Sequence, residues 1–315
     1  MSCNHSYKSK TKEKQIFFLL ILLFFNINFT IAQNSQLSFS TGASVNVNDF
    51  QWSIAGNTQG QSPNILSELI FKKVTSLGIY LEGTYRPFKF FEINSFYQKN
   101  GVISGNGFDA DYNGDNRTNP TYNEPFLSNK GELEIFRLGV NLFFVHKGNF
   151  HLGTGVFYAS TIQNLYILNS DFENLKSTYK AKCRGPMFSL NGNYKINKKL
   201  SIRGSLSYCF VKYNAEANWN LIDEFMHPLS FDQYSKGRNT DGEIGFSYKL
   251  NSLFALTING TIGNAKSFKG IDKSYLKTNT QILTQFNGSN STFYAFRIGT
   301  NIVFFNHCSI PSQKI

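Results

Sequence analysis

Alternating apolar and polar residues are the feature that most constrains the fold of this chain. Five stretches show the pattern clearly: 37–47, 136–144, 200–208, 243–250 and 296–304. Successive side chains of a β-strand point to opposite faces, so each stretch predicts a strand that is apolar on one face and polar on the other. A membrane-spanning β-barrel has this pattern in every strand, because lipid lies outside and a polar lumen lies inside. A soluble β-sandwich is the alternative, and it would show less apolar surface on one face of every strand.

The N-terminal residues predict a secretory signal peptide. Four basic residues come first: Lys8, Lys10, Lys12 and Lys14. An apolar run at 16–25 follows, and the small residue Ala32 precedes Gln33. This order of charge, apolar run and small residue predicts cleavage near Ala32 or Gln33. A transmembrane anchor is the alternative, but Asn26 and Asn28 interrupt a run that is already short for a span of about 20 residues.

Composition narrows the function classes. Aromatic residues make up 16% of the chain and charged residues another 16%, with 32 Phe and 16 Tyr. No long apolar run follows the leader, so helices cannot carry the exported chain across a membrane, whereas the aromatic content suits the girdles of a barrel. The net charge of +11 favours anionic partners, so we expect contacts with outer-membrane lipid and lipopolysaccharide. We expect no nucleic-acid partner, because no basic run is interleaved with aromatic residues and the chain is exported.

The cysteines indicate neither a disulfide nor a metal site. Cys3 lies in the leader, and Cys183, Cys209 and Cys308 remain, an odd number without metal or disulfide spacing. We interpret these three as buried or lipid-facing small apolar residues.

Short and long connections alternate between the predicted strands. The short ones lie at 86–89, 146–149, 197–199 and 250–252, and the long polar ones lie at 49–63, 107–129, 166–180, 217–233 and 267–290. Outer-membrane barrels have short periplasmic turns and long extracellular loops. Residues 34–305 are therefore predicted to form an all-β fold, a single antiparallel transmembrane β-barrel of about ten strands with both termini periplasmic. Residues 1–33 would be the cleaved signal peptide and 306–315 a short C-terminal tail.

Charged residues occupy inward positions of several predicted strands. They are Glu82, Glu92, Arg137, Arg203, Glu243, Lys249 and Arg297. Mixed charges inside a barrel are expected to pair with one another and fill the lumen. The alternative is a water-filled path whose selectivity these charges set. Because the diameter of a barrel grows with the number of strands, ten strands predict a narrow or plugged lumen.

The second outer loop carries the densest group of oxygen ligands. Four of its residues alternate as in the first half of a calcium-binding loop: Asp109, Asp111, Asn113 and Asp115. Gly114 stands at the turn, but the closing carboxylate is missing, because Pro120 occupies the twelfth position and Glu124 comes four residues later. Calcium is the one cofactor that the sequence suggests. The alternative is a polar turn whose Asp and Asn side chains bond their own backbone.

The carboxylates of Asp109 and Asp111 also suggest hydrolytic chemistry. Residues two apart on a strand share a face, and close like charges raise one pKa, which can leave a shared proton or position a water. Here the order of features resembles the omptins, ten-stranded outer-membrane barrels that include surface proteases. The likeness is carried by Ser67-Glu68-Leu69 with Leu77-Gly78-Ile79, by Asp109-Ala110-Asp111-Tyr112, and by Gly185-Pro186-Met187 through the strand at 199–216.

A closer resemblance is to the Protochlamydia-type outer-membrane proteins, an omptin-like barrel family. It is carried by three loop motifs: Asp111-Tyr112-Asn113-Gly114-Asp115-Asn116-Arg117-Thr118, Trp219-Asn220-Leu221 and His227-Pro228. The likeness covers nearly the whole exported chain. It implies the barrel fold and a place in the outer membrane.

The resemblance to omptins also implies a set of catalytic residues. Omptin proteases hold a water between an Asp pair in the second loop and an Asp-x-His pair in the fourth. The first pair matches Asp109 and Asp111, whereas Asp223 and His227 are four residues apart rather than two. In an extended strand that spacing separates them by about 13 Å, although a turn could bring them together.

Three functions are consistent with these patterns. We prefer a non-enzymatic protein with a porin-like or surface interaction role, whose outer loops contact small solutes or surface ligands. The first alternative is an omptin-type endopeptidase with four catalytic residues: Asp109, Asp111, Asp223 and His227. The second is an adhesin or a calcium-stabilised binding surface.

Overall fold

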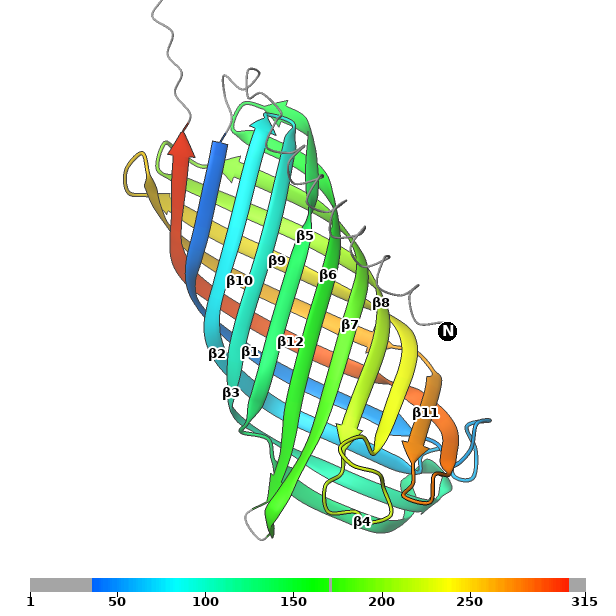
Figure 1. Ribbon diagram of the computed structural model, residues 1–315. Coiled ribbons are helices and arrows are strands. Elements are labelled where there is room, and N and C mark those ends of the chain that lie inside the picture. The colour runs from blue at the N-terminus through cyan, green and yellow to red at the C-terminus, as the bar shows by residue number, and fades with distance from the viewer. Residues whose placement is uncertain (1–35, 170–171, 306–315) are drawn as a thin grey trace, which may run out of the picture.

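A computed structural model describes residues 36–169 and 172–305 of the chain (Figure 1). Within these residues it has twelve β-strands and one turn of 3-10 helix, η1. The first six strands are β1 (Gln36–Ile54), β2 (Ser67–Phe88), β3 (Phe91–Gly114), β4 (Thr118–Leu127), β5 (Gly131–Lys147) and β6 (Phe150–Asn169), with η1 (Asp115–Arg117) between β3 and β4. The other six are β7 (Phe172–Lys195), β8 (Leu200–Asn218), β9 (Phe231–Lys249), β10 (Phe254–Ser267), β11 (Gly270–Tyr275) and β12 (Gln281–Phe305).

Some expectations fall outside these ranges. The expected signal peptide at 1–33, the tail at 306–315 and Cys308 all lie outside the described residues. In the part of the chain that is described, no helix is long and apolar enough to cross a membrane.

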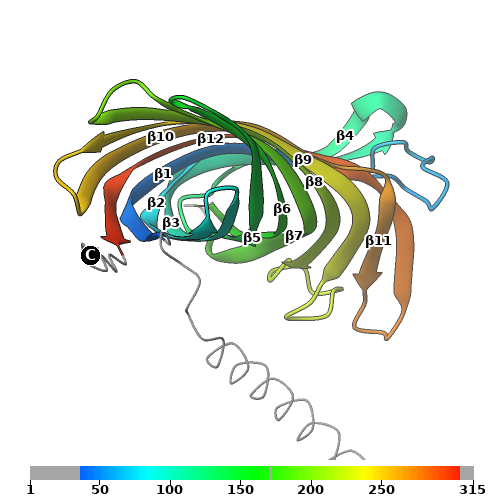
Figure 2. The same ribbon diagram turned by 90° about the horizontal axis from the view of Figure 1, so that it is seen from above.

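Ten of the strands close a single antiparallel ring, which Figure 2 shows from above. Each ring strand pairs with the next in chain order, and β12 pairs with β1 from Gln36 opposite Phe305 to Ile54 opposite Phe286. A closed ring gives every strand a hydrogen-bonded neighbour on both sides, which lipid requires because it cannot satisfy backbone polar groups. The prediction of a β-barrel of about ten strands is confirmed.

The remaining strands, β4 and β11, extend the outer end of the barrel. β4 folds back on β3, and β11 lies between β9 and β12. Residues 107–129 and 267–290, expected to be loops, are therefore mostly strand, and so is 166–180, because β6 runs to Asn169 and β7 begins at Phe172. Beyond the membrane the outward face of a strand meets water instead of lipid, so strands continue there without the apolar outward face on which the sequence prediction rested.

The short turns gather at the other end. They join β2 to β3, β5 to β6, β7 to β8 and β9 to β10, and each has four residues or fewer between strands. The start of β1 and the end of β12 lie side by side at this same end (Figure 1). Short turns together with both chain ends identify it as the periplasmic end.

A belt of exposed apolar side chains surrounds the barrel. On β2, Ile79 and Leu81 are 62% and 52% exposed, whereas Tyr80 between them is 1% exposed and points into the lumen. This distribution is the reverse of a soluble β-sandwich and suits contact with lipid. Beyond the belt the outward face becomes charged, as the 3.2 Å ion pair between Lys99 and Glu132 shows.

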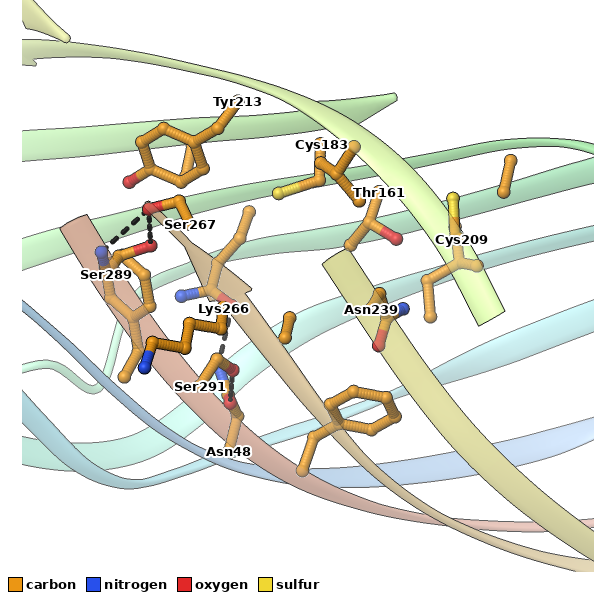
Figure 3. A pocket seen from close by; sticks show the side chains of 18 of the residues that line it. Asn48, Thr161, Cys183, Cys209, Tyr213, Asn239, Lys266, Ser267, Ser289 and Ser291 are labelled. Atoms are coloured by element: carbon orange, nitrogen blue, oxygen red, sulfur yellow. Dashed lines mark hydrogen bonds between the residues drawn. The ribbon is translucent and has the colours of Figure 1, made fainter. Parts of the chain in front are cut away.

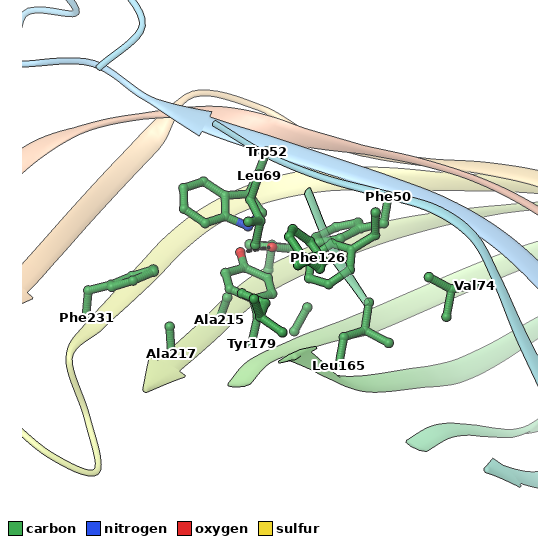
Figure 4. Packing of buried hydrophobic residues seen from close by; sticks show 14 of the residues in the cluster. Phe50, Trp52, Leu69, Val74, Phe126, Leu165, Tyr179, Ala215, Ala217 and Phe231 are labelled. Carbon is green, nitrogen blue, oxygen red and sulfur yellow. Dashed lines mark hydrogen bonds between the residues drawn. The ribbon is translucent and has the colours of Figure 1, made fainter. Parts of the chain in front are cut away.

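An aromatic cluster fills the outer half of the lumen (Figure 4). We call it the aromatic plug, and it consists of Phe50, Trp52, Phe71, Phe126, Tyr179, Tyr213, Phe231 and Phe286, each 7% exposed or less. The rings come from opposite sides of the barrel and contact one another, with Trp52 stacked on Tyr179 at 5.3 Å and Tyr213 on Phe286 at 5.5 Å. Side chains thus seal the lumen above the membrane.

A second layer, of paired charges, lies deeper in the lumen. We call it the charged layer, and it consists of Glu82, Arg137, Arg203, Asp241, Glu243 and Arg297. Arg203 lies 3.2 Å from Glu82 and 3.4 Å from Glu243, which also pairs with Arg297. The expected pairing of lumen charges is present here. Glu92 instead pairs with Arg86, and Lys249 is exposed at the periplasmic end.

Two cavities lie in the lumen below the aromatic plug. The upper one, of about 110 Å³, is lined by Cys183, Cys209, Thr161 and Asn48, among others (Figure 3). The lower one, of about 270 Å³, borders the charged layer. Cys183 and Cys209 are free thiols that face the lumen, so of the two proposed environments they occupy the interior one.

Candidate functional site

The outer end of β3 places two carboxylates on one side of an open cleft. Asp109 and Asp111 are two residues apart on a strand, so their side chains share a face. Their cross-strand neighbours on β4 are Glu124 and Tyr122, and Asp111 lies opposite Ser67 on β2. The strand pairing therefore brings together the Asp pair that the sequence predicted and adds Glu124 beside it.

We call the space in front of these carboxylates the outer cleft, with a volume of about 320 Å³. Its lining consists of Ser67, Asp109, Asp111, Tyr122, Glu124, Pro125, Phe126, Ile167, Asn169, Phe172, Leu175, Ser177, Trp219, Leu221 and Ile222. The wall facing the carboxylates comes from β6, β7 and the β8–β9 connection and is mostly apolar, with Asn169 and Ser177 as its polar residues. The outer cleft therefore has one acidic and one largely apolar wall.

The aromatic plug supports the apolar wall. The Trp219 ring lies 4.8 Å from Phe231 and 6.5 Å from Trp52, both in the plug. Asn220 fixes the same connection, because its carboxamide accepts from the Lys176 amide and donates to the Asn174 carbonyl. The cleft wall is thus built on the packed interior of the barrel rather than on a free loop.

The cleft changes the acidity of the carboxyl groups, which lie beyond the apolar belt and outside the membrane. Burial, with a smaller contribution from the charge of Asp111, raises the pKa of Asp109 to about 7. Burial also raises the pKa of Asp111, against a hydrogen bond from Ser67 that lowers it. Asp109 therefore titrates near neutral pH and can hold a proton or release it to a ligand.

The other two residues of the catalytic alternative have different partners. Asp223 is fully exposed and lies 3.4 Å from the Lys277 ammonium. His227 Nδ1 is 2.8 Å from the Asn218 carboxamide oxygen. Neither residue lines the outer cleft. The structure brings Asp109 and Asp111 together, and within residues 36–169 and 172–305 no carboxylate pairs with His227 to orient it.

The calcium candidates do not form a calcium loop. Asp109, Asp111 and Asn113 fall on β3, where ligands at alternate positions are about 6.6 Å apart, too far for three to surround one ion. Asp115 instead accepts a hydrogen bond from the Asn64 amide at 2.7 Å. Among the described residues, no three His, Cys, Asp or Glu side chains are grouped so as to hold a metal. Calcium binding stays a prediction.

The comparisons with known proteins bear on this geometry. A family profile described as "Protochlamydia outer membrane protein" matches residues 45–304, most of the chain. The chain belongs to this family. Two of the three family motifs singled out in the sequence border the outer cleft, since Asp111 begins the first and Trp219 begins the second, whereas His227-Pro228 does not line it. A search of curated protein sequences finds no match.

Solved structures show the fold of this Protochlamydia outer membrane protein family member. The outer membrane protease OmpT of Escherichia coli is 14% identical with a TM-score of 0.61, and the match covers 86% of this chain and 96% of OmpT. OprG of Pseudomonas aeruginosa is 10% identical, and the match covers 87% and 99% of the two chains with a TM-score of 0.38. At such identity the likeness to OmpT concerns the fold and carries no activity.

The first family motif has a structural role that the sequence did not reveal. Arg117 donates to both carboxylate oxygens of Glu68 at 2.8–3.0 Å, and the Tyr112 hydroxyl donates to the same carboxylate at 2.9 Å. The Asn116 amide donates to the Asn64 side chain at 2.8 Å. These contacts clamp the β3–β4 hairpin to β2 and to the β1–β2 connection. The contacts join residues about 50 positions apart, so local sequence gave no signal for them.

Proposed function

We propose that this outer-membrane barrel is a non-enzymatic surface protein with a sealed lumen, and that the outer cleft is its interaction site. One observation carries the proposal. The Asp pair of the cleft faces Trp219, Leu221 and Ile222, and none of the residues that line it is a histidine. The omptin arrangement holds the water between the Asp pair and a histidine, and the lining of the cleft supplies no histidine to accept a proton from it.

The filled lumen supports a surface role over a porin-like one. Solute passage would have to cross both the aromatic plug and the charged layer. Trp52 and Tyr179 are 4% and 1% exposed and stack on each other, so the plug leaves no room between them for a hydrated solute. The porin-like alternative would need both layers to move.

The omptin-type endopeptidase is the second candidate, because Asp109 and Asp111 share a face in the cleft. It would need the β8–β9 connection to rearrange until His227 leaves Asn218 and reaches the Asp pair. Asp223 would also have to leave Lys277. This candidate therefore depends on a conformation different from the one described.

One experiment separates these functions. Refolded protein in detergent with lipopolysaccharide is offered a panel of fluorogenic peptides that includes dibasic sequences, with Asp111→Asn beside it, and the same samples are inserted into planar bilayers. We expect no cleavage and no conductance steps. Cleavage by the parent that Asp111→Asn abolishes would overturn the non-enzymatic proposal, and stable conductance would overturn the sealed lumen. Heat-shifted gel mobility checks that both proteins are folded.

We further propose lipopolysaccharide phosphate groups as partners of the barrel wall. Arg184, Lys212 and Lys236 stand in register on neighbouring strands β7, β8 and β9, and all three are exposed. Lys212 follows Phe210, an exposed residue of the apolar belt, and alternates with the buried Val211. None of the three cations forms an ion pair within the described residues. A row of cations just beyond the belt suits the anionic head groups of an outer leaflet.

A further inference from the structure

We propose that the outer cleft binds a small amphipathic amine, a molecule with one protonated amino group and a short aromatic or aliphatic body. The proposal deepens the proposed function and rests on it, because it names the ligand of the same cleft. The charge of one wall, the apolar character of the other and the size of the space between them all favour such a ligand.

The charge of the cleft favours a cationic ligand. Asp109, Asp111 and Glu124 line it, and none of its lining residues is a Lys, Arg or His. Asp109 forms no ion pair and no hydrogen bond within the part of the chain that the structure describes, and its side chain is partly buried. A carboxylate partly removed from water without a counter-charge is costly, so a cationic ligand would stabilise it.

Among the described residues, the titratable groups around Asp109 are acids and one tyrosine. On its own strand it faces Asp111, and from β4 it faces Glu124 and Tyr122. Its neighbour on β2 is Leu69, and the described part of the opposite wall contributes no titratable side chain. Burial, and to a smaller degree the charge of Asp111, raise the pKa of Asp109 and favour its protonated form, so a ligand cation has to displace that proton.

The opposite wall favours a ligand whose remaining part is apolar. Trp219, Leu221 and Ile222 stand across from the carboxylates, and Ile167 and Leu175 continue the apolar surface. An ammonium group at the Asp pair would place its own hydrocarbon against this wall and remove apolar surface from water on both sides. A fully hydrated inorganic cation would gain nothing from this wall.

The size of the cleft limits the ligand. A volume of about 320 Å³ lies at the lower end for small-molecule sites, so it suits a compact amine rather than a folded partner. The wall is held by the aromatic plug through the contacts of Trp219, so little ordering is needed on binding.

Phenethylamine is a suitable probe, and 2-phenylethanol is its uncharged match. Refolded full-length protein is titrated with each by calorimetry at pH 8 and pH 6. The chain has two tryptophans, Trp52 in the plug and Trp219 in the cleft, so fluorescence locates the site. A Trp52→Phe variant should keep the fluorescence change on binding, and a Trp219→Phe variant should lose it.

We expect the amine to bind at least about tenfold more tightly than the alcohol, and Asp109→Asn to remove about the same factor, as for a lost charged hydrogen bond. Binding should weaken from pH 8 to pH 6 in the parent, because the proton on Asp109 competes with the amine, but not in Asp109→Asn. Glu224→Gln removes an acid of the same β8–β9 connection outside the cleft and is the matched control, with unchanged affinity.

Equal affinity for amine and alcohol, or full affinity in a folded Asp109→Asn, would overturn the amine proposal. The same samples are tested for peptide cleavage and conductance. Absent amine binding in an inactive, non-conducting protein would contradict this inference alone. Cleavage or conductance would contradict the proposed function, whatever the amine does.

Discussion

The Arg297 guanidinium on β12 lies 4.8 Å from the centre of the Phe96 ring on β3, and it also pairs with Glu243 on β9. These three strands are not neighbours in the ring, so one side chain joins distant parts of the wall across the lumen. Arg297 is 7% exposed, and the Glu243 side chain is 14% exposed. Arg297 therefore holds the charged layer together from the inside.

We expect Arg297→Met to lower the free energy of unfolding by about 3 kcal/mol, the lower end for breaking a buried ion pair, because Arg203 still faces Glu243. Urea unfolding in lipid vesicles measures this. The control is Lys182→Met, which removes an outward ion pair with Glu216 and should cost less than about 1 kcal/mol. Equal losses in both variants would show that the charged layer adds no more than a surface pair.

Substitutions of Trp52 test both the packing and the polarity of the aromatic plug. Trp52 is 4% exposed, and its indole N–H has no hydrogen-bond partner within the described residues. Trp52→Ala should lower the free energy of unfolding by about 3–5 kcal/mol through the cavity it leaves. Trp52→Phe keeps a ring and removes an unpaired donor, so it should cost less than about 1.5 kcal/mol. Similar losses for Ala and Phe would contradict close packing at this position.

The buried Asp272 on β11 should make the free energy of unfolding depend on pH. It is 1% exposed, accepts a hydrogen bond from Gln233 at 2.8 Å, and burial raises its pKa to about 6 from the model-peptide value of 3.8. Between these values the folded protein binds more protons than the unfolded chain, so the contribution of Asp272 to stability falls as pH rises from about 4 to 6.

An Asp272→Asn variant removes this titration. The stability of Asp272→Asn relative to the parent should therefore increase between pH 4 and pH 7, with most of the change complete near pH 6. Unfolding by urea at several pH values measures the difference. A difference that stays constant with pH would mean that Asp272 does not titrate in this range in the folded protein.

Substitutions of the three exposed cations in register on β7, β8 and β9 test the proposed lipopolysaccharide contact. Replacing Arg184, Lys212 and Lys236 by Gln should reduce the rise in melting temperature that added lipopolysaccharide produces, since each cation near an anionic surface contributes about 1 kcal/mol. The matched control replaces Lys195, Lys198 and Lys199, which are exposed at the periplasmic end, and should respond like the parent. The lipopolysaccharide proposal fails if both triple variants respond like the parent.

The sequence by itself determined the barrel. Alternation along residues such as 296–304 depends only on the period of a strand and on lipid outside and a polar lumen inside, so it predicted strands, turns and inward charges locally. It misjudged 107–129 and 267–290, because the outward face of a strand above the membrane meets water instead of lipid and loses its apolar residues.

Only the tertiary structure decided what the candidate site is. Sequence spacing placed Asp109 beside Asp111 but could not tell that Trp219 and Leu221 face them, since a cleft is defined by contacts between residues about 110 positions apart. The sequence also left open whether Asp223 and His227 lie close together. In the fold Asp223 pairs with Lys277, and His227 contacts Asn218. Local periodicity is a property of each strand alone, whereas the walls of a cleft depend on how the closed ring brings distant strands face to face.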